Sequence, residues 1–271
     1  MSARRRGVAA AFAFSALAFA SLARAHEATA SCAGAHSVFA PLPDGCLATI
    51  DTDRPHQTDT PHVVPAGHVQ VESALAALAV GSLAGGARER GARLSLFDDN
   101  YKVGVVDGVD AQLAFRHASY ATSERRFAPP GPYNFRVKLR LLVEDGAVPA
   151  VTLVPTIFVP VDPADSVRGG ALLFWGWELP AGFELEVNAG ALFGRAPRRS
   201  IAAVLAAAIT KELALDLRAF VDVYATGPEV AFGTGLLLPV TRDLQLDAGT
   251  YVGIHGDEPV VTPFVGASIR R

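Results

Sequence analysis

The sequence predicts an all-β protein, an antiparallel up-and-down outer-membrane β-barrel of about twelve strands with an irregular N-terminal segment. Three observations support this prediction. The first residues have the pattern of an export signal, most of the remaining chain alternates apolar and polar residues with a period of two, and short turn signals separate the alternating segments.

Residues 1–25 have the features of a cleavable secretory signal peptide. Arg4-Arg5-Arg6 precedes an apolar run from Val8 to Leu22, and Ala23-Arg24-Ala25 supplies small residues where a signal peptidase would cut. A transmembrane anchor is the less favoured alternative, because the apolar run is shorter than the roughly 20 residues that a bilayer span needs. We therefore expect an exported protein that is cleaved after Ala25.

Composition limits the partners of the exported part. Residues 1–25 contain four arginines and no carboxylate, so 20 of the 24 basic residues remain against 27 acidic ones, a net charge of about −7. No basic block remains that would favour a nucleic-acid partner. No long apolar run follows Ala25, so membrane insertion would have to use strands, because only helices and closed barrels satisfy their backbone groups in lipid.

Residues 26–66 show no regular period, and we expect an irregular periplasmic segment or a plug against the barrel mouth. The segment holds both cysteines, Cys32 and Cys46, and disulfides persist in exported proteins. A bridge between them would stabilise the local fold by about 3 kcal/mol in the chain-entropy model. Two free thiols or a metal pair are the alternatives, although two cysteines lack the four ligands of a structural zinc site.

The transmembrane barrel is predicted over residues 67–271, where the period changes to two. The clearest strand is the segment 134–141, in which every second residue is basic or an amide and every other one is apolar. Similar alternation runs through residues 69–75, 109–116, 183–188, 215–224 and 244–253. Each such strand has one apolar face and one polar face.

Short turn signals separate these strands, and counting the strands between them gives about twelve. Most of the connections are short enough for hairpins. The signals are Asp107-Gly108, Glu144-Asp145-Gly146, Pro180-Ala181-Gly182, Lys211-Glu212, Thr226-Gly227-Pro228, Thr241-Arg242-Asp243 and Gly256-Asp257-Glu258-Pro259.

Two segments do not follow the pattern. Residues 200–210 are almost wholly apolar, and alanine favours helix by propensity. We nevertheless expect a strand there, because turn signals flank the segment at hairpin distance. In residues 153–165 three prolines interrupt an apolar run, and proline belongs at strand starts, bulges or ends. We expect a strand that leaves the sheet into an external loop.

Alternation alone does not separate a membrane barrel, whose apolar face points to lipid, from a soluble barrel, whose apolar face points inward. The export signal, a strand count above the eight or so of a ligand-holding soluble barrel, and polar faces that carry both charges favour the membrane barrel. A soluble periplasmic ligand binder stays as the alternative.

The residues before the first strand carry a resemblance to a known family. The run Thr52-Asp53-Arg54-Pro55-His56-Gln57-Thr58-Asp59-Thr60-Pro61 is followed by Pro65-Ala66-Gly67-His68-Val69-Gln70-Val71-Glu72. Together they resemble the opening of a family of bacterial outer-membrane barrels named after the meta-pathway of phenol degradation. The motif residues are Thr52, Asp53, Arg54, Pro55, Gly67, Gln70 and Glu72. Segments 101–113, 138–160, 211–215 and 241–247 also look like hairpins of this family, so the resemblance covers most of residues 50–270.

The resemblance implies a barrel for the passage of aromatic or other hydrophobic compounds. Its implied partners are outer-membrane lipid, the barrel-assembly machinery and a small-molecule solute. The chain departs from the family pattern at His56, where an acidic residue is usual, and at Asp59 and Thr60, which replace Glu and Ser. It ends in Ser268-Ile269-Arg270-Arg271 instead of an aromatic residue, so we expect a weaker signal for barrel assembly.

The charged residues of the polar faces are the candidates for lining the lumen. As a pore lining they would set charge selectivity. Alternatively, opposite charges pair and fill the interior, which we favour for most of them because a small barrel has little free space. The candidates are Glu72, Asp110, Arg116, Arg136, Lys138, Arg140, Glu184, Glu186, Asp216, Arg218, Asp222 and Asp247.

Catalytic, metal and cofactor chemistry find little support in the sequence. His56, His62 and His68 recur at six-residue steps, but the spacing means little in a loop, and zinc ligands normally come with tighter local spacing and supporting partners. No Gly-x-Ser-x-Gly elbow or phosphate-binding motif occurs. We therefore expect a non-enzymatic barrel without a cofactor, either a passive channel or transporter for small aromatic or hydrophobic compounds or a structural barrel with a filled lumen.

Overall fold

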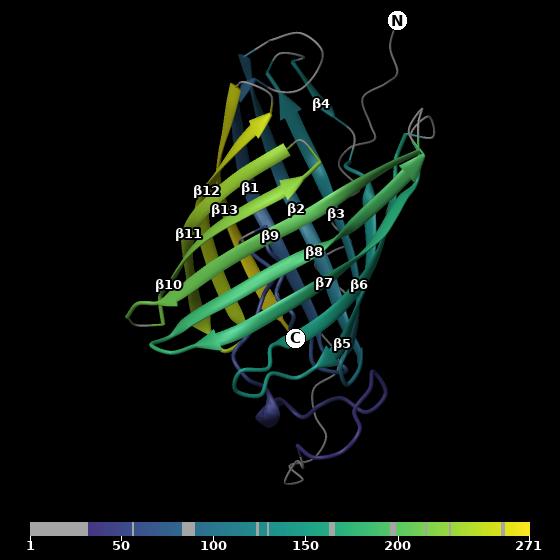
Figure 1. The fold of residues 1–271 in the computed structure, drawn as a ribbon, viewed down its shortest axis with the longest axis vertical. Helices are drawn as coiled ribbons and strands as arrows, with labels where there is room; N and C mark the ends of the chain where they lie inside the picture. Colours follow the sequence, from purple (N-terminus) through teal and green to yellow (C-terminus); the bar gives the residue numbers. More distant parts are fainter. Residues whose placement is uncertain are drawn as a thin grey trace, which may run out of the picture.

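In the described part of the chain, twelve long antiparallel strands close into a barrel, and a short thirteenth strand extends one of them (Figure 1). The predicted signal peptide, residues 1–25, lies outside the described residues. The computed structural model describes residues 32–55, 57–82, 90–122, 125–128, 130–162, 166–195, 199–214, 216–227, 229–255 and 258–271.

The elements follow the alternation and the turn signals of the sequence closely. A 3-10 turn, η1, covers Asp44–Cys46 in the N-terminal segment. The strands are β1 (Val69–Ser82), β2 (Arg90–Val106), β3 (Val109–Ala121), β4 (Arg126–Ala128), β5 (Tyr133–Leu142), β6 (Ala150–Val159), β7 (Arg168–Leu179), β8 (Phe183–Arg195), β9 (Arg199–Glu212), β10 (Arg218–Thr226), β11 (Glu229–Thr241), β12 (Leu244–His255) and β13 (Glu258–Arg270).

The sheet closes because β2 pairs with β1 on one side and with β3 on the other. Strand β1 also pairs with β13, β3 pairs with β5, and strands β5 to β12 each pair with the next in sequence order. Strand β4 pairs only with the last residues of β3 and stands outside the ring of twelve. The prediction of an antiparallel up-and-down barrel of about twelve strands is confirmed.

Both segments that depart from the pattern form strands, as predicted. The alanine-rich residues 200–210 lie inside β9, and residues 153–159 belong to β6, which ends just before Pro160. Pro155 lies within β6, and the ladder with β5 passes from Arg136↔Thr156 directly to Leu139↔Leu153 around it. Proline has no N–H to donate, which accounts for an interruption at this place.

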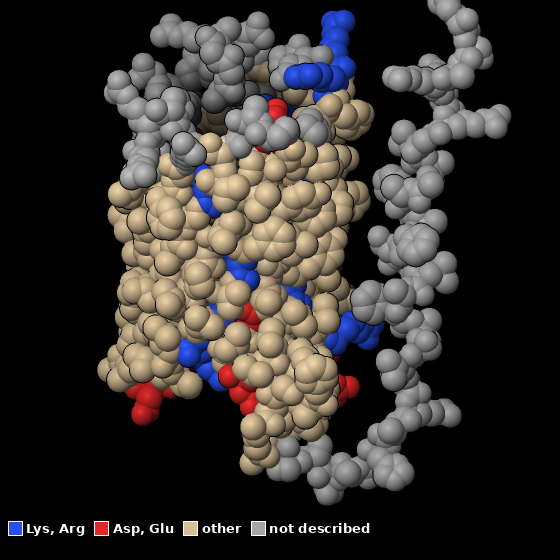
Figure 2. Space-filling model, turned by 90° about the vertical axis from the view of Figure 1, so that its right-hand side faces the viewer, with Lys and Arg blue, Asp and Glu red and all other residues tan. Residues whose placement is uncertain are grey.

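Side-chain direction follows the alternation. In β5, Phe135 and Val137 are 49% and 36% exposed on the outer face, whereas Lys138 is 1% exposed inside. On the face shown in Figure 2 the wall is mostly uncharged, and the charged side chains lie mainly in its lower part and at its upper rim. An apolar exterior around a polar interior is the arrangement of an outer-membrane barrel. None of the helices in the described residues is long and apolar enough to cross a membrane.

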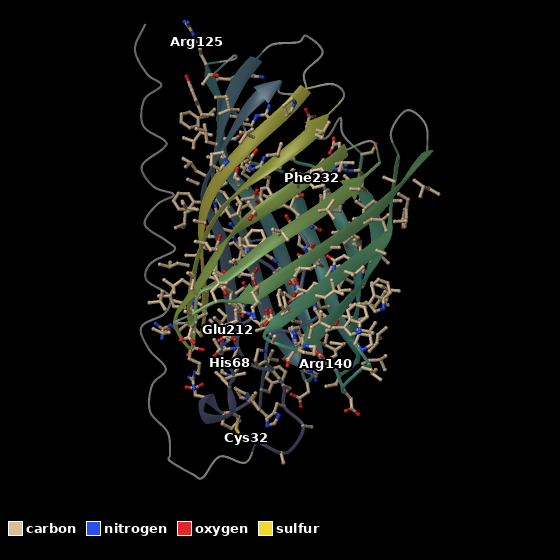
Figure 3. The ribbon with its side chains drawn as sticks, turned by 60° about the vertical axis from the view of Figure 1, so that its left-hand side comes forward. Cys32, His68, Arg125, Arg140, Glu212 and Phe232 are labelled. Carbon is tan, nitrogen blue, oxygen red and sulfur yellow. A yellow bond between two sulfur atoms is a disulfide. The ribbon has the colours of Figure 1, made fainter. Side chains whose placement is uncertain are left out.

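The two ends of the barrel differ. The N-terminal segment, the end of β13, short turns such as Asp107-Gly108 and the seven-residue connection between β5 and β6 lie at one end, and the connection from β3 to β5, which contains β4, lies at the other. Outer-membrane barrels have short periplasmic turns and longer extracellular loops, so the first end is periplasmic. Figure 3 shows Cys32, His68 and Arg140 toward this end and Arg125 toward the other.

One predicted turn is displaced. Lys211 and Glu212 still belong to β9, and the chain turns afterwards, before β10 begins, with hydrogen bonds from Leu213 N to Leu217 O and from Leu217 N to Ala214 O. In the sequence, Leu215 and Leu217 alternate with Asp216 and Arg218 as in a strand, so the pattern alone extended the next strand too far toward the N-terminus.

The N-terminal segment closes against the periplasmic mouth. A disulfide joins Cys32 to Cys46, and Val38 N donates to Val105 O of β2. Just before β1 the chain approaches β2 closely, with Gly67 N bonded to Gly104 O. Gly67 has φ +80°, and a Cβ atom on Gly104 would lie 2.0 Å from the carbonyl oxygen of Pro65. Both positions therefore require glycine.

Candidate luminal site

Residues 50–55 and 57–66, here called the luminal segment, pass through the interior of the barrel instead of staying below it. They bond to side chains on strands far apart around the wall. Val64 N donates to Asp110 of β3 (2.9 Å), Asp59 N to Asn188 of β8 (2.7 Å) and Gln57 N to Asp222 of β10 (2.6 Å). Thr152 of β6 donates to the carbonyl oxygen of Pro61. The segment is thus bound from several sides of the lumen.

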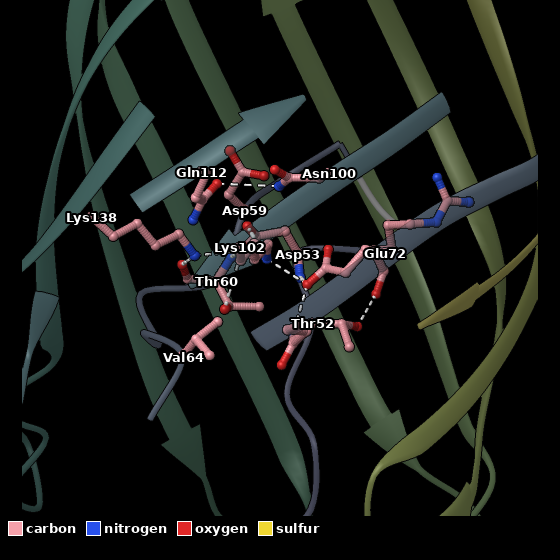
Figure 4. A network of polar contacts seen from close by, with 12 residues as sticks. Thr52, Asp53, Asp59, Thr60, Val64, Glu72, Asn100, Lys102, Gln112 and Lys138 are labelled. Carbon is pink, nitrogen blue, oxygen red and sulfur yellow. Dashed lines mark hydrogen bonds and ion pairs between the residues drawn. The ribbon is translucent and has the colours of Figure 1, made fainter. Parts of the chain in front are cut away.

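Asp53 is the centre of a buried charge cluster (Figure 4). One carboxylate oxygen lies 2.5 Å from Nζ of Lys138 and the other 2.6 Å from Nζ of Lys102. Arg136 Nη2 lies 3.9 Å away, and Thr60 N donates to Asp53 over 3.1 Å. Burial by itself would raise the pKa of Asp53, but the three cations outweigh it and hold that pKa well below its usual range.

Glu72 of β1 completes the cluster. Lys102 donates to it as well as to Asp53, and Asp53 N bonds to the same carboxylate oxygen over 3.2 Å. Gln70, two residues earlier on the same inward face, donates to Glu72 and to Asp51 O, both over 2.7 Å. A buried charge pair needs such additional hydrogen bonds to offset the cost of desolvation.

A second group of contacts fixes the other side of the luminal segment to β12. Arg54 Nη2 donates to Asp247 over 3.1 Å, and Gln245 donates to Thr52 Oγ1 over 2.7 Å. Tyr251 donates its hydroxyl hydrogen to Pro55 O. The four residues of the Thr-Asp-Arg-Pro motif, Thr52 to Pro55, therefore bridge from β1, β2 and β5 to β12.

A cavity of about 300 Å³ lies beside the luminal segment. Arg136 precedes Lys138 on β5, which runs toward a periplasmic turn, so the cavity is on the extracellular side of the Asp53 cluster. Arg136 Nη2 donates to Asp59 there over 2.7 Å. The lining residues are Gln57, Asp59, Asn134, Arg136, Thr156, Phe158, Leu172, Asn188, Leu192, Val204, Ala206 and Tyr224.

The structure places most of the predicted lumen candidates inside the barrel. Glu72, Asp110, Lys138, Glu186, Asp222 and Asp247 are buried. Arg136, Arg116, Glu184 and Arg218 are partly buried. Two of these pair with each other, since Arg218 Nη1 lies 3.2 Å from Glu184, and Arg116 pairs with Asp98 at 2.9 Å. Of the twelve, these residues reach the luminal segment directly: Glu72, Asp110, Arg136, Lys138, Asp222 and Asp247.

Two candidates are not in the lumen. Asp216 is exposed in the turn before β10, with φ +63°, a conformation that Asp adopts more readily than most residues. The prediction for Asp216 was wrong because the alternation continues by chance through that turn. Arg140 has the inward register of β5 but is exposed at the periplasmic rim, where its backbone N bonds to Gly108 O.

Sequence reasoning missed Lys102, which contacts both carboxylates of the cluster. The signal was present, because Lys102 and Gly104 alternate with Val103 and Val105, but the segment was interpreted as a hairpin and its charge was not considered. The roles of Asp59 and Asn188 could not be found in this way. Both depend on the path of an irregular segment that has no periodicity.

Metal binding finds no support within the residues that the structure describes, where no group of three or more His, Cys, Asp or Glu side chains could hold an ion. His56 lies outside the described residues. His62 Nε2 lies 3.3 Å from Asp51, and His68 Nε2 contacts Leu42 O at 2.7 Å. The two histidines thus have separate structural partners.

A polar cluster on the outer wall was not expected. Ser73 Oγ donates to Asp99 over 2.5 Å, and the other carboxylate oxygen of Asp99 lies 2.9 Å from His117 Nε2 and accepts from the Tyr101 hydroxyl over 2.9 Å. The carboxylate therefore stands between the serine and the histidine. Nucleophilic catalysis needs the histidine next to the serine instead.

Comparison with known proteins gives one family match. The model of a family described as "Putative MetA-pathway of phenol degradation" matches residues 52–270. A comparison with curated proteins gives no match.

Several solved structures resemble the chain at low identity. The KdgM porin, solved in complex with disordered oligogalacturonate, is 10% identical with a TM-score of 0.46, covering 74% of this chain and 98% of the porin. The translocator domain of the autotransporter NalP from Neisseria meningitidis is 11% identical with a TM-score of 0.45, covering 74% and 88%. Outer membrane phospholipase A from Escherichia coli is 12% identical with a TM-score of 0.42, covering 81% and 94%.

Proposed function

Since the chain belongs to the family described as putative MetA-pathway of phenol degradation, we propose that it is a passive outer-membrane channel or transporter for small aromatic or other hydrophobic compounds. The observation that carries the proposal is the cavity beside the luminal segment. Phe158, Leu172, Leu192 and Val204 form an apolar side of it, and polar side chains such as Asn134, Arg136 and Asn188 line the rest. Small-molecule sites likewise combine an apolar wall with polar groups that fix the orientation of the ligand.

The luminal segment determines how a solute would cross. It bonds to the wall on several sides, so a solute would pass beside it or displace it. A barrel of this strand number has a narrow interior, which favours small solutes over large ones. The apolar outer face would contact outer-membrane lipid, and insertion would use the barrel-assembly machinery.

Uptake by vesicles tests the proposal. The full mature chain is refolded into lipid vesicles, and the entry of phenol is compared with that of a neutral disaccharide, while single-channel recordings are made in planar bilayers. We expect phenol to enter faster than in protein-free vesicles and the disaccharide to enter slowly. The proposal would be contradicted if neither solute entered faster than into bare vesicles and no conductance was recorded.

A structural barrel with a filled lumen is the second candidate, favoured by the buried contacts of the luminal segment. In that case removing the segment would create permeability that the intact chain lacks. Deleting residues 51–63 and measuring conductance separates the two functions. A channel conducts with the segment present, whereas a filled barrel conducts only without it.

We also infer that the protein has no hydrolase activity. On the outer wall Ser73 and His117 both bond to Asp99, and no Ser–His contact joins them in the described structure. Assay of refolded protein with ester and phospholipid substrates tests this inference, and turnover that Ser73→Ala abolishes would refute it.

A further inference from the structure

The contact between Arg136 and Asp59 suggests which solutes the cavity binds. We propose that Arg136 binds the carboxylate of a small monocarboxylate with an apolar body, in exchange for the side chain of Asp59. This inference rests on the proposed channel function and specifies a solute class for it. Asp59 would then be an internal competitor, a carboxylate of the protein in the place where the carboxylate of the solute binds.

The bonding of Arg136 leaves room for a second partner. Among the described residues, its guanidinium donates hydrogen bonds through Nη2, to Asp59 at 2.7 Å, and the same nitrogen lies 3.9 Å from Asp53. A guanidinium presents five N–H donors in a planar fork and commonly binds a carboxylate through two of them. A single-nitrogen contact at a cavity wall is therefore weaker than a bidentate contact with a solute would be.

Asp59 is able to leave without moving the luminal segment. Its backbone N donates to Asn188 Oδ1 over 2.7 Å, and its carbonyl oxygen accepts from Asn188 Nδ2 over 2.8 Å. These two bonds hold the backbone whatever the side chain does. The Asp59 side chain is 26% exposed, against 4% for Asp53, which two lysines bind. Asp53 is thus fixed in place, and Asp59 is free to rotate away.

The rest of the cavity fits an apolar body. Its apolar lining comes from four neighbouring strands, β6 to β9, and consists of Phe158, Leu172, Leu192, Val204 and Ala206. A volume of about 300 Å³ is at the lower end for ligand pockets, so it suits a single ring or a short branched chain. Thr156 donates to Asn134 Oδ1 over 2.6 Å near the polar side, so these two groups already have partners.

The charge balance favours a monoanion. Arg136 is one cation and lies beside two carboxylates, so a solute that replaces Asp59 brings back one negative charge and restores the local balance. A cationic solute would meet the unscreened guanidinium, and a neutral one would leave Asp59 in place. A dianion would bring one charge more than the site balances in a region of low dielectric.

Calorimetry with benzoate on the refolded, full mature chain tests the inference. Asp59→Asn removes the competing carboxylate, so we expect benzoate to bind about tenfold more tightly than to the unaltered chain. Arg136→Gln removes the guanidinium, and we expect binding at least tenfold weaker. Benzyl alcohol, a neutral compound of similar size, should bind all three proteins equally.

Matched changes at the periplasmic end serve as controls. Arg242→Gln alters an arginine in the turn between β11 and β12, and Asp44→Asn alters an exposed carboxylate in η1, both far from the cavity. Both should bind benzoate as the unaltered chain does. Arg136→Lys, which keeps the charge but not the fork, serves if Arg136→Gln does not refold.

The outcomes separate this inference from the channel proposal. The inference is overturned if the unaltered chain and Arg136→Gln bind benzoate equally. It is also overturned if Asp59→Asn binds benzoate no more tightly than the unaltered chain does. If phenol still enters vesicles in that case, the channel proposal stands. If benzoate binds through Arg136 but no solute crosses, the site exists and the channel proposal fails.

Discussion

Asp53 and Lys138 are separated by 85 residues in the sequence, yet a carboxylate oxygen of one lies 2.5 Å from the ammonium nitrogen of the other. Both are almost fully buried. This contact joins the irregular luminal segment to the barrel wall, and Lys102 makes the same join from β2. The Asp53 cluster therefore determines whether the segment stays in the lumen.

Asp53→Asn should loosen the luminal segment. The change leaves Lys102 and Lys138 buried with one carboxylate fewer, and breaking a buried ion pair by removing one partner costs about 3–5 kcal/mol. We expect higher conductance in planar bilayers and faster proteolysis between residues 50 and 66. The barrel itself should still migrate as a folded species in unheated gel samples.

The matched control for this prediction is Asp44→Asn. Asp44 is exposed at the periplasmic mouth, so the same loss of a carboxylate should change neither conductance nor proteolysis. Unaltered conductance in Asp53→Asn would show that the cluster does not hold the segment.

The same carboxylate predicts how the luminal segment responds to acid. The pKa of Asp53 is lowered in the folded protein. The stability that Asp53 contributes is therefore fully present above its pKa in the unfolded chain, about 3.9, and is lost as the pH falls toward its pKa in the folded protein. The difference in protease resistance between the unaltered chain and Asp53→Asn should be constant from pH 7 to about 4 and narrow below that. If the difference in protease resistance already narrowed between pH 7 and 5, a titratable group other than Asp53 would be responsible for it.

Val137→Arg should hinder the stable insertion of the barrel. Val137 points outward from the middle of β5, and a cation on the lipid face near the bilayer centre costs about 2–4 kcal/mol. Leu141→Arg, on the same face but near the periplasmic turn, should cost about 0–1 kcal/mol. Denaturant unfolding in lipid vesicles gives both values, and equal costs would mean that this face does not contact lipid.

Removing the disulfide should affect the N-terminal segment and leave the barrel intact. The bridge closes a loop over a sequence separation of 14 residues, for which the chain-entropy model gives about 3 kcal/mol. We expect Cys32→Ser with Cys46→Ser to be cleaved faster between residues 33 and 45, as shown by limited proteolysis and mass spectrometry. The thermal unfolding of the barrel should not change, and a lower unfolding temperature would show that the segment supports the barrel.

The strands and the direction of their side chains follow from the sequence because alternation is a local property. In residues 134–141 the position of each residue along the pleat determines whether it points to lipid or to the lumen, and Arg136 and Val137 take opposite sides as expected. Because alternation is local, it also explains the error at Asp216: apolar and polar residues continue to alternate through the turn, and nothing in that pattern signals that the strand has ended.

The sequence by itself therefore determined the class of fold, the number of strands and the inner and outer faces, all of which depend on neighbouring residues. The tertiary structure alone decided that Asp53 meets Lys102 and Lys138, and that Asp59 lies against Arg136 at a cavity. The physical reason is that closure of the ring sets which strands face each other across the lumen. The path of residues 50–66 through it depends on hydrogen bonds to strands scattered along the whole chain, such as those from Asp110, Asn188 and Asp222.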